Sequence, residues 1–296
     1  MQKDLSVSII NYKTKQLTEK CLQSIFNKKW KTDFDVYILD NASKDGSVEY
    51  LRTRFPQFNV VESEENVGFG AGHNINLKKI TTKYVLILNS DTEILDDVID
   101  RMVLFMDEHK QVGVSSCKIV GFDDKLQPNG GDLPFGATLF TWLLNLESLG
   151  IKNPNFHRQE KDYYDNTHEV GWVSGNFMIA RIDVLQKVNF FTEDYFMYFE
   201  DVDLCLKVKE AGFKIMLYPQ VTIKHLSGGS ADNPKLRQWI GEYKGLLRFY
   251  QKRFGVLSSL LLKLMIYFAT FLRIIAFAIV GKIDYSLTYA KVIKSI

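Results

Sequence analysis

The feature that most constrains the fold is a regular alternation of strand-like and helix-like segments over the first 90 residues. Four strand-like runs, each four to six residues long, end in turn-forming residues: Val7–Ile10, Phe34–Leu39, Asn59–Glu62 and Lys83–Leu88. The segment Leu17–Phe26, between the first two runs, carries its apolar residues at helical spacing. Short strands that alternate with helices are typical of a mainly parallel sheet flanked by helices. We therefore expect an α/β fold built on such a sheet.

Polar side chains follow three of these runs. Asn11 follows the first run, Asp40 the second and Asp91 the fourth. The carboxyl ends of parallel strands share one edge of a sheet, and ligands bind there in open α/β folds. A carboxylate at the end of a buried strand is costly unless it is paired or bound to a metal. We therefore expect a binding site at this edge, although Asn-Ser-Asp-Thr around Asp91 is also ordinary turn chemistry.

A second candidate site is an acidic cluster, Glu200, Asp201 and Asp203, at the start of a segment with a helical pattern. The helix dipole stabilises acids at a helix N-terminus, so the cluster also has a purely structural explanation. Capping needs only one acid, however, and three acids close together raise the pKa of at least one of them. A carboxyl group with a raised pKa is a good general base. We expect Asp91 and this cluster to face each other across one cavity.

The glycine-rich segment 66–74 excludes two common phosphate-binding motifs. A GxGxxG fingerprint that starts at Gly68 requires glycine at position 73, where the chain has His73, and the chain contains no GxxxxGK[ST] motif. The glycines still allow the backbone to approach a ligand or a neighbouring helix closely. The pattern after Gly72 predicts a helix over Ile75–Ile80.

Composition excludes several classes of protein. The 296 residues include 37 Lys or Arg and 35 Asp or Glu, a net charge of +2, and 46% are apolar, which excludes a disordered or a small disulfide-rich protein. The cysteines, Cys21, Cys117 and Cys205, have no disulfide or zinc spacing, which favours a reducing compartment. The N-terminal apolar run Leu5–Ile10 is too short for the core of a signal peptide, so we expect a cytoplasmic protein.

The near-neutral total charge hides an asymmetric distribution. Residues 235–296 carry eleven basic and two acidic side chains, a net charge of +9, whereas residues 1–234 carry −7. The tail also contains Leu264–Val280, an apolar run interrupted only by Arg273 and shorter than the roughly 20 residues of a membrane-spanning helix. On one continuous helix, five basic side chains would fall within a stripe of about 100°: Lys244, Arg248, Lys252, Lys263 and Arg273.

These features predict a basic amphipathic tail that lies in the membrane interface. We expect a main domain over 1–234 and a helical, membrane-associating region over 235–296, with a break at Gly255. An apolar helix that packs on the body is the alternative, since apolar segments are usually buried. The tail's aromatic residues lie in its apolar run rather than among basic residues, which favours lipid over nucleic acid as a partner.

Five short segments follow one another along the chain in a distinctive order. They begin at Val7, Asp40, Asn66, Leu88 and Tyr198 and read VSIINY, DNASKDGS, NVGFGAGHN, LNSDT and YFEDVDLCLK. Together they resemble the motifs of family 2 inverting glycosyltransferases of GT-A fold, and most of all the bacterial rhamnosyltransferase-type branch of that family. A single motif of this kind is weakly specific, but five in this order are highly specific. The resemblance covers about residues 5–230.

The resemblance implies a nucleotide-sugar donor site at the edge of the sheet. Asp40 would accept a hydrogen bond from the pyrimidine N3–H of the donor, beside Asn11 and Tyr12. The other residues expected to bind the nucleotide are Asn66, Gly70, Asn74 and Asn89.

The resemblance also implies a divalent cation, Mg²⁺ or Mn²⁺, that bridges the donor diphosphate. Asp91 would bind the cation, and His225 matches a histidine that approaches the metal in some members of the family. On its own His225 is a lone histidine, and such residues are usually structural. The family's usual Asp-x-Asp motif is here Asn89-Ser90-Asp91, so metal binding depends on Asp91 and His225.

On the acceptor side, the resemblance makes Asp201 the general base. Glu200 and Asp203 would orient Asp201 or the acceptor, and Gly175 and Asn176 would form the acceptor-side loop. A single displacement would invert the anomeric centre without a covalent enzyme intermediate.

We therefore expect an inverting, metal-dependent glycosyltransferase on the cytoplasmic face of the membrane. It would transfer L-rhamnose from dTDP-rhamnose to a saccharide or lipid-linked saccharide in cell-surface polysaccharide biosynthesis. A UDP-sugar donor, carrying a hexose or galactofuranose, is an alternative because both pyrimidines present N3–H to Asp40. A nucleotidyltransferase is a second alternative, although residues 11–14 supply no glycine for its phosphate loop. A non-catalytic, membrane-bound nucleotide-sugar-binding protein is a third.

Overall fold

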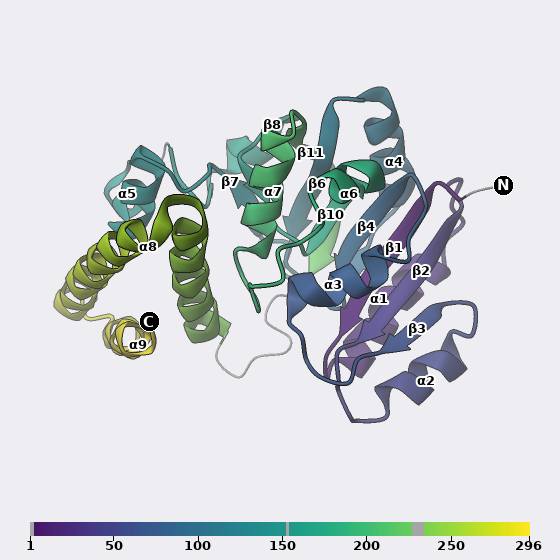
Figure 1. Ribbon diagram of the computed structural model, residues 1–296, viewed down its shortest axis with the longest axis horizontal. Coiled ribbons are helices and arrows are strands. Elements are labelled where there is room, and N and C mark those ends of the chain that lie inside the picture. Colours follow the sequence, from purple (N-terminus) through teal and green to yellow (C-terminus); the bar gives the residue numbers. More distant parts are fainter. Residues whose placement is uncertain (1–2, 152–153, 227–233) are drawn as a thin grey trace.

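The four strand-like runs of the N-terminal part form adjacent parallel strands in the order β3-β2-β1-β4 (Figure 1). Their bounds are β1 Leu5–Asn11, β2 Phe34–Asp40, β3 Asn59–Glu62 and β4 Tyr84–Asn89. The computed structural model describes residues 3–151, 154–226 and 234–296. The predicted α/β fold with a mainly parallel central sheet is confirmed.

The rest of the sheet is mixed. Beyond β4 the order is β10-β6-β11-β5, with β10 antiparallel to both its neighbours, β11 parallel to β6, and β8 also paired to β11. These strands are β5 Thr92–Ile94, β6 Val112–Val120, β8 His168–Glu169, β10 Phe177–Arg181 and β11 Lys214–His225. A separate two-stranded ladder joins β7 (Gly130–Gly131) and β9 (Trp172–Val173).

The strand register brings the polar ends of several strands to one edge. Asn11 lies opposite Asp40 across β1 and β2, and Ile10 lies opposite Asn89 across β1 and β4. Although β11 and β5 come last in the strand order, His225 at the end of β11 is paired with Thr92 of β5, and its Nε2 lies 3.2 Å from Nδ2 of Asn89 at the end of β4. The residues that the sequence placed after three different strands therefore converge at one edge.

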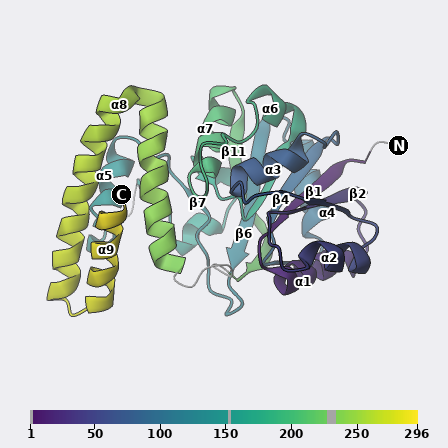
Figure 2. The same ribbon diagram turned by 60° about the horizontal axis from the view of Figure 1, so that its bottom comes forward.

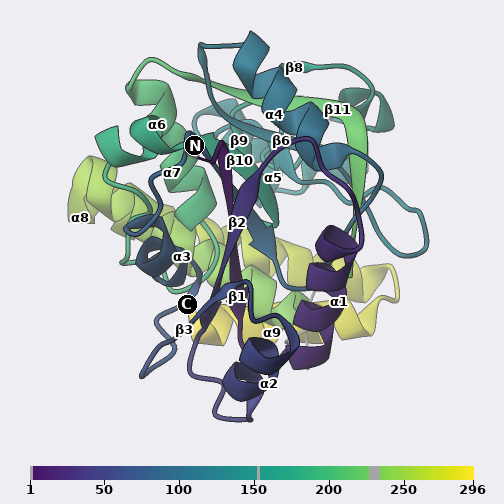
Figure 3. The same cartoon turned by 90° about the vertical axis from the view of Figure 1, so that its right-hand side faces the viewer.

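Helices cover both faces of the sheet (Figure 3). The helices before the tail are α1 Lys15–Phe26, α2 Ser47–Arg54, α3 Phe69–Leu77, α4 Val98–Glu108, α5 Ala137–Leu143, α6 Ile182–Lys187 and α7 Glu200–Glu210, with 3₁₀ turns at Leu146–Leu149 and Lys161–Tyr164. Side chains of β4 alternate between two cores: Val85 and Ile87 face the core under α3, α6 and α7, whereas Leu86 and Leu88 face the core under α1 and α4.

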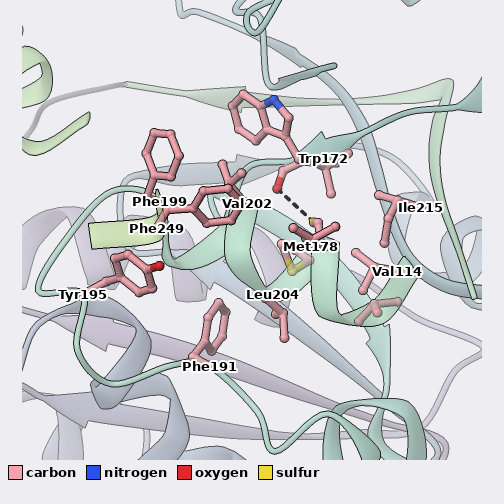
Figure 4. Packing of buried hydrophobic residues seen from close by; sticks show 14 of the residues in the cluster. Val114, Trp172, Met178, Phe191, Tyr195, Phe199, Val202, Leu204, Ile215 and Phe249 are labelled. Atoms are coloured by element: carbon pink, nitrogen blue, oxygen red, sulfur yellow. Dashed lines mark hydrogen bonds between the residues drawn. The ribbon is translucent and has the colours of Figure 1, made fainter. Parts of the chain in front are cut away.

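The tail consists of α8 (Pro234–Ile279) and α9 (Ile283–Ser295), and α8 is two helical arms joined at Gly255 (Figure 2). Gly255 has a φ of 84°, which glycine adopts without steric cost, so the expected break occurs there. The first arm packs on the body: Phe249 is fully buried and lies beside Phe199 and Val202 (Figure 4). The body and the first arm of α8 therefore share one core.

The second arm of α8 leaves many apolar side chains exposed, including Leu257 (71%) and Ile279 (79%). In the described part of the chain, α8 is the one helix whose length and composition would allow it to span a membrane, and 22% of its most apolar window is buried. The five basic residues do not form one continuous stripe, because the chain reverses at Gly255. Arg248 and Lys252 instead pair with Asp194 of the body, at 3.1 and 2.5 Å.

Candidate active site

A cavity of about 560 Å³ opens at the edge of the sheet where the polar strand ends converge. We call it the main cavity. Nine of the residues expected to act in the site line it: Tyr12, Asn66, Asn89, Asp91, Gly175, Asn176, Glu200, Asp201 and His225. The remaining five lie behind its wall: Asn11, Asp40, Gly70, Asn74 and Asp203. Asp91 and Asp201, which are far apart in the sequence, thus border the same space.

At one end of the main cavity, His225 and Asp91 form a close pair. The Nε2 of His225 lies 3.2 Å from Oδ1 of Asp91 and 3.2 Å from Nδ2 of Asn89. Its Nδ1 lies 2.9 Å from Oε1 of Gln127, and Nε2 of Gln127 donates to the His225 carbonyl at 2.8 Å. Because the Gln127 Oε1 can only accept, Nδ1 carries the proton and Nε2 keeps its lone pair in the neutral ring.

This pair fits a divalent cation with few protein ligands. A ring nitrogen and a carboxylate oxygen are placed side by side, and Gln127 fixes the ring from behind, as outer residues commonly do for metal-binding histidines. In the described residues no three His, Cys, Asp or Glu side chains form a potential metal cluster. Two protein ligands suit Mg²⁺ or Mn²⁺ held jointly with substrate phosphates and water.

Asp40 and Asn11 are fully buried and bonded to each other. Asn11 Nδ2 donates to Oδ2 of Asp40 at 2.5 Å, and the Ser43 N–H donates to its Oδ1 at 2.9 Å. At this end the wall is formed instead by Tyr12, Asn66 and Asn41, a residue that sequence reasoning missed. The pyrimidine contact of Asp40 stays a prediction, and it requires the carboxylate to become accessible.

Gly70 and Asn74 hold the loop that leads to the acidic cluster. Asn74 Nδ2 donates to the carbonyl of Phe191 at 2.9 Å, and its Oδ1 accepts from the Phe191 N–H at 3.1 Å. A Cβ on Gly70 would lie 3.0 Å from the Cβ of Phe191, so glycine allows this close approach. In this structure both residues support the loop and do not reach the main cavity.

Two of the three clustered acids reach the main cavity. Asp201 accepts from the N–H of Gly175 at 3.2 Å and from the N–H of Val202 at 2.8 Å, which fixes its carboxylate. Burial raises the pKa of Asp201 to about 6, despite those two hydrogen bonds. Burial and the neighbouring Asp201 raise the pKa of Glu200 well above its usual value, and its Oε2 has no hydrogen-bond partner.

Asp203 points elsewhere. Its Oδ2 accepts from Thr192 Oγ1 at 2.6 Å, and its Oδ1 lies 3.8 Å from Nη2 of Arg253 on α8. Asp203 therefore ties α7 to the preceding loop and to the tail. Chemically, the main cavity offers a histidine and a carboxylate side by side at one place and a carboxyl group suited to take a proton near neutral pH at another.

Comparison with known proteins decides the family. The family model "Glycosyl transferase family 2" matches residues 6–199, more than half of the chain. The chain belongs to glycosyl transferase family 2. It is a nucleotide-sugar-dependent glycosyltransferase, as the resemblance predicted.

The glycosyltransferase is similar to curated proteins over much of its length. It is 24% identical to an N-acetylglucosaminyl-diphospho-decaprenol L-rhamnosyltransferase of Mycobacterium tuberculosis over 233 residues, 74% of this chain and 75% of that protein. It is 29% identical to rhamnosyltransferase WbbL of Escherichia coli over 159 residues, 51% of this chain and 58% of that protein. The solved mannosyltransferase PcManGT from Pyrobaculum calidifontis, in complex with GDP-Man and Mn²⁺, has the same fold, with a TM-score of 0.60 at 16% identity over 98% of this chain and 79% of that chain.

In this glycosyltransferase, a strained loop sets the start of α7. Tyr198 and Phe199 have φ values of 71° and 75°, which bulky residues rarely adopt. The first arm of α8 holds the loop from one side: a Cβ on Gly241 would lie 2.1 Å from Cδ2 of Tyr198, and one on Gly245 would lie 2.6 Å from the Cβ of Phe199. The tail thus fixes the backbone that carries Asp201.

The tail also supplies part of the cavity wall. Arg237, Gln238 and Glu242 of α8 line the main cavity beside His157. Gln238 Nε2 donates to Oε1 of Glu242 at 2.7 Å, and His157 Nε2 lies 3.3 Å from the same oxygen. We did not predict these residues from the sequence, because the charges of the tail indicated a membrane partner. The four-residue spacing of Gly241 and Gly245 is a pattern from which close packing of this arm could have been predicted.

Proposed function

We propose that the protein is an inverting glycosyltransferase that moves a sugar from a pyrimidine nucleotide to a lipid-linked saccharide in cell-surface polysaccharide biosynthesis. The observation that carries the proposal is that Asp91, His225 and Asp201 border one cavity of about 560 Å³. The donor diphosphate would lie at the Asp91–His225 end. The acceptor would enter beside Asp201, where α8 forms the wall.

Asp91 and His225 are the residues proposed to hold a divalent cation. Such a cation, when bound, would neutralise the charge that develops on the leaving nucleoside diphosphate. Gln127 accepts a hydrogen bond from Nδ1 of His225, which keeps Nε2 oriented toward Asp91. Asn89, in place of the usual first acid of the motif, contributes a hydrogen bond rather than a charge, so this site is less negative than one with two acids.

Asp201 is proposed to act as the general base. Its carboxylate takes the proton of the acceptor hydroxyl while the hydroxyl oxygen bonds to the anomeric carbon and the bond to the diphosphate oxygen breaks. One such displacement inverts the anomeric centre. The N–H groups of Gly175 and Val202 hold the carboxylate in place, and its pKa of about 6 keeps it largely ionised at pH 7.

L-Rhamnose from dTDP-rhamnose is the donor that we propose, supported by the two rhamnosyltransferases among the similar proteins. A UDP-linked hexose or galactofuranose is the alternative, because uracil and thymine present the same N3–H. A donor screen tests both: the nucleoside diphosphate released from UDP-, dTDP- and GDP-sugars is measured with and without Mn²⁺. We expect the fastest release from dTDP-rhamnose and little without metal. No release from any sugar nucleotide would refute the proposal in favour of a non-catalytic binding protein.

We also propose that the protein lies on the cytoplasmic face of the membrane through the second arm of α8 and through α9. Exposed apolar side chains support this: Leu257, Leu260, Leu261, Leu264, Phe268, Phe271, Ile279 and Leu287. Monomeric soluble proteins rarely expose apolar surface on this scale. The basic residues contribute less than the sequence predicts, since Arg248 and Lys252 are paired with the body.

A further inference from the structure

A second cavity, of about 420 Å³, adjoins the main cavity. Four residues line both: Pro128, His157, Gln238 and Glu242. Beyond them the walls come from α5, α8 and α9 and from Asn145, Glu147, Asn155 and Gln159. The three helices contribute six aromatic rings: Trp142, Trp239, Tyr243, Phe277, Tyr285 and Tyr289. The second cavity therefore leads from the acceptor side of the active site into the tail.

Arg273 also lines the second cavity, and it is the one charged residue within the apolar run 264–280. Its Nη1 donates to the Tyr289 hydroxyl at 2.6 Å and its Nη2 to the carbonyl of Trp142. Its Nε is buried without a hydrogen-bond partner. In the described parts of the chain, no carboxylate oxygen lies within 4.0 Å of the guanidinium, so Arg273 forms no direct ion pair there, and Glu242 favours its charge only from a greater distance. A buried cation without an anionic partner is costly.

The two carboxylates that line the second cavity are already hydrogen-bonded. Asn155 Nδ2 donates to Oε2 of Glu147 at 3.0 Å, and Glu242 accepts from Gln238 and lies beside His157. The Oδ1 of Asn155 is buried and unpartnered. Among the described residues that line the second cavity, Arg273 is thus the cation without a directly contacting anion, and a neutral sugar would not supply one. An anionic group at the guanidinium would.

The order of chemical environments matches a lipid-linked acceptor. The proposed general base, Asp201, lines the main cavity, and the Arg273 guanidinium lines the second cavity. Phe277 and Tyr285 also line the second cavity. Ile279 and Ile283, which lie close to them on the same two helices, are exposed to solvent. We propose that the second cavity binds the phosphate or diphosphate that links the acceptor sugar to its lipid, with Arg273 as its main contact. This inference rests on the proposed function, because it takes the acceptor to be lipid-linked.

Binding to the full-length protein tests this site without knowledge of the acceptor sugar. The probes are farnesyl diphosphate, farnesol and inorganic pyrophosphate, measured by equilibrium binding with saturating dTDP and Mn²⁺ to fill the donor site. We expect farnesyl diphosphate to bind at least tenfold more tightly than farnesol, which lacks the anion, and than pyrophosphate, which lacks the lipid. Arg273→Gln should weaken farnesyl diphosphate at least tenfold, because a charge-assisted hydrogen bond is lost. Arg273→Lys should keep part of the affinity.

Lys263→Gln is the matched control: it removes a positive charge from the same helix at a residue that does not line the second cavity. It should leave farnesyl diphosphate binding unchanged, and dTDP binding and the melting temperature show that each variant is folded. Equal binding of farnesol and farnesyl diphosphate by the wild type would overturn the inference, whatever the variants do. So would pyrophosphate that binds as tightly as farnesyl diphosphate, or equal losses in the two Gln variants. Donor hydrolysis is measured separately, so a failure of the proposed function is distinguishable from a failure of this site.

Discussion

The role of Asp201 as general base makes a quantitative prediction about pH. Only the ionised carboxylate can take a proton, and the pKa of Asp201 is raised to about 6 by burial. About a tenth of the molecules are therefore ionised at pH 5 and about nine tenths at pH 7. With saturating donor and metal, we expect the transfer rate to rise about tenfold between pH 5 and pH 7 and then to level off. An Asp with an ordinary pKa would give a flat profile over this range.

Asp201→Asn removes the base while it keeps the size of the side chain. General-base catalysis typically contributes about 10² to 10⁴ in rate, so we expect transfer to fall by that factor and the rise with pH to disappear. Binding of dTDP should be unchanged, since the nucleotide lies at the Asp91–His225 end. Glu210→Gln, on the exposed end of the same helix, is the control. Near-native turnover in Asp201→Asn, or a rate in the wild type that is constant from pH 5 to pH 7, would refute the assignment.

Three further predictions concern the metal pair, the strained loop and the tail. Gln127→Ala should raise the half-saturating Mn²⁺ concentration for donor hydrolysis about tenfold or more, because the His225 ring loses the hydrogen bond that orients it. An unchanged Mn²⁺ requirement would contradict the proposal that Asp91 and His225 hold the cation. Gly245→Val should lower the free energy of unfolding in urea by about 1–3 kcal/mol, because its side chain would overlap Phe199; an unchanged midpoint would contradict the packing. The double variant Leu257→Asp, Leu264→Asp should lose flotation with anionic liposomes and keep its melting temperature, since both side chains are exposed; full flotation would exclude this surface.

Much of the fold follows from local patterns that the structure keeps. The strand-like runs became β1 to β4 because their apolar residues fill both cores, and parallel pairing then fixed Asn11 beside Asp40. The glycine segment was less predictable: the expected helix over 75–80 in fact begins at Phe69. Glycine disfavours a helix on propensity, but it lets α3 pack closely on its neighbours: a Cβ on Gly70 would lie 3.0 Å from the Cβ of Phe191, and one on Gly72 would lie 2.9 Å from Cδ1 of Ile10.

The site was predictable where one motif holds both the residue and its neighbours, as for Asp91 and Asp201. It was less predictable where the role depends on distant partners. Gln127 matters because it meets His225, 98 positions away, and no local pattern carries that contact. Likewise, the charge of the tail indicated a membrane, whereas Glu242 in its first turns lines the main cavity. Removal of the whole tail would take away buried Phe249, so point substitutions are the cleaner test.

The roles of Asp91 and His225 can be tested by the position of Mn²⁺ in a crystal of the protein with dTDP, located by anomalous scattering. We expect one ion in contact with the Asp91 carboxylate and the His225 Nε2, with the diphosphate bound to it inside the main cavity. An ion held by Glu200 and Asp201 instead, or a nucleotide bound outside the main cavity, would contradict these roles.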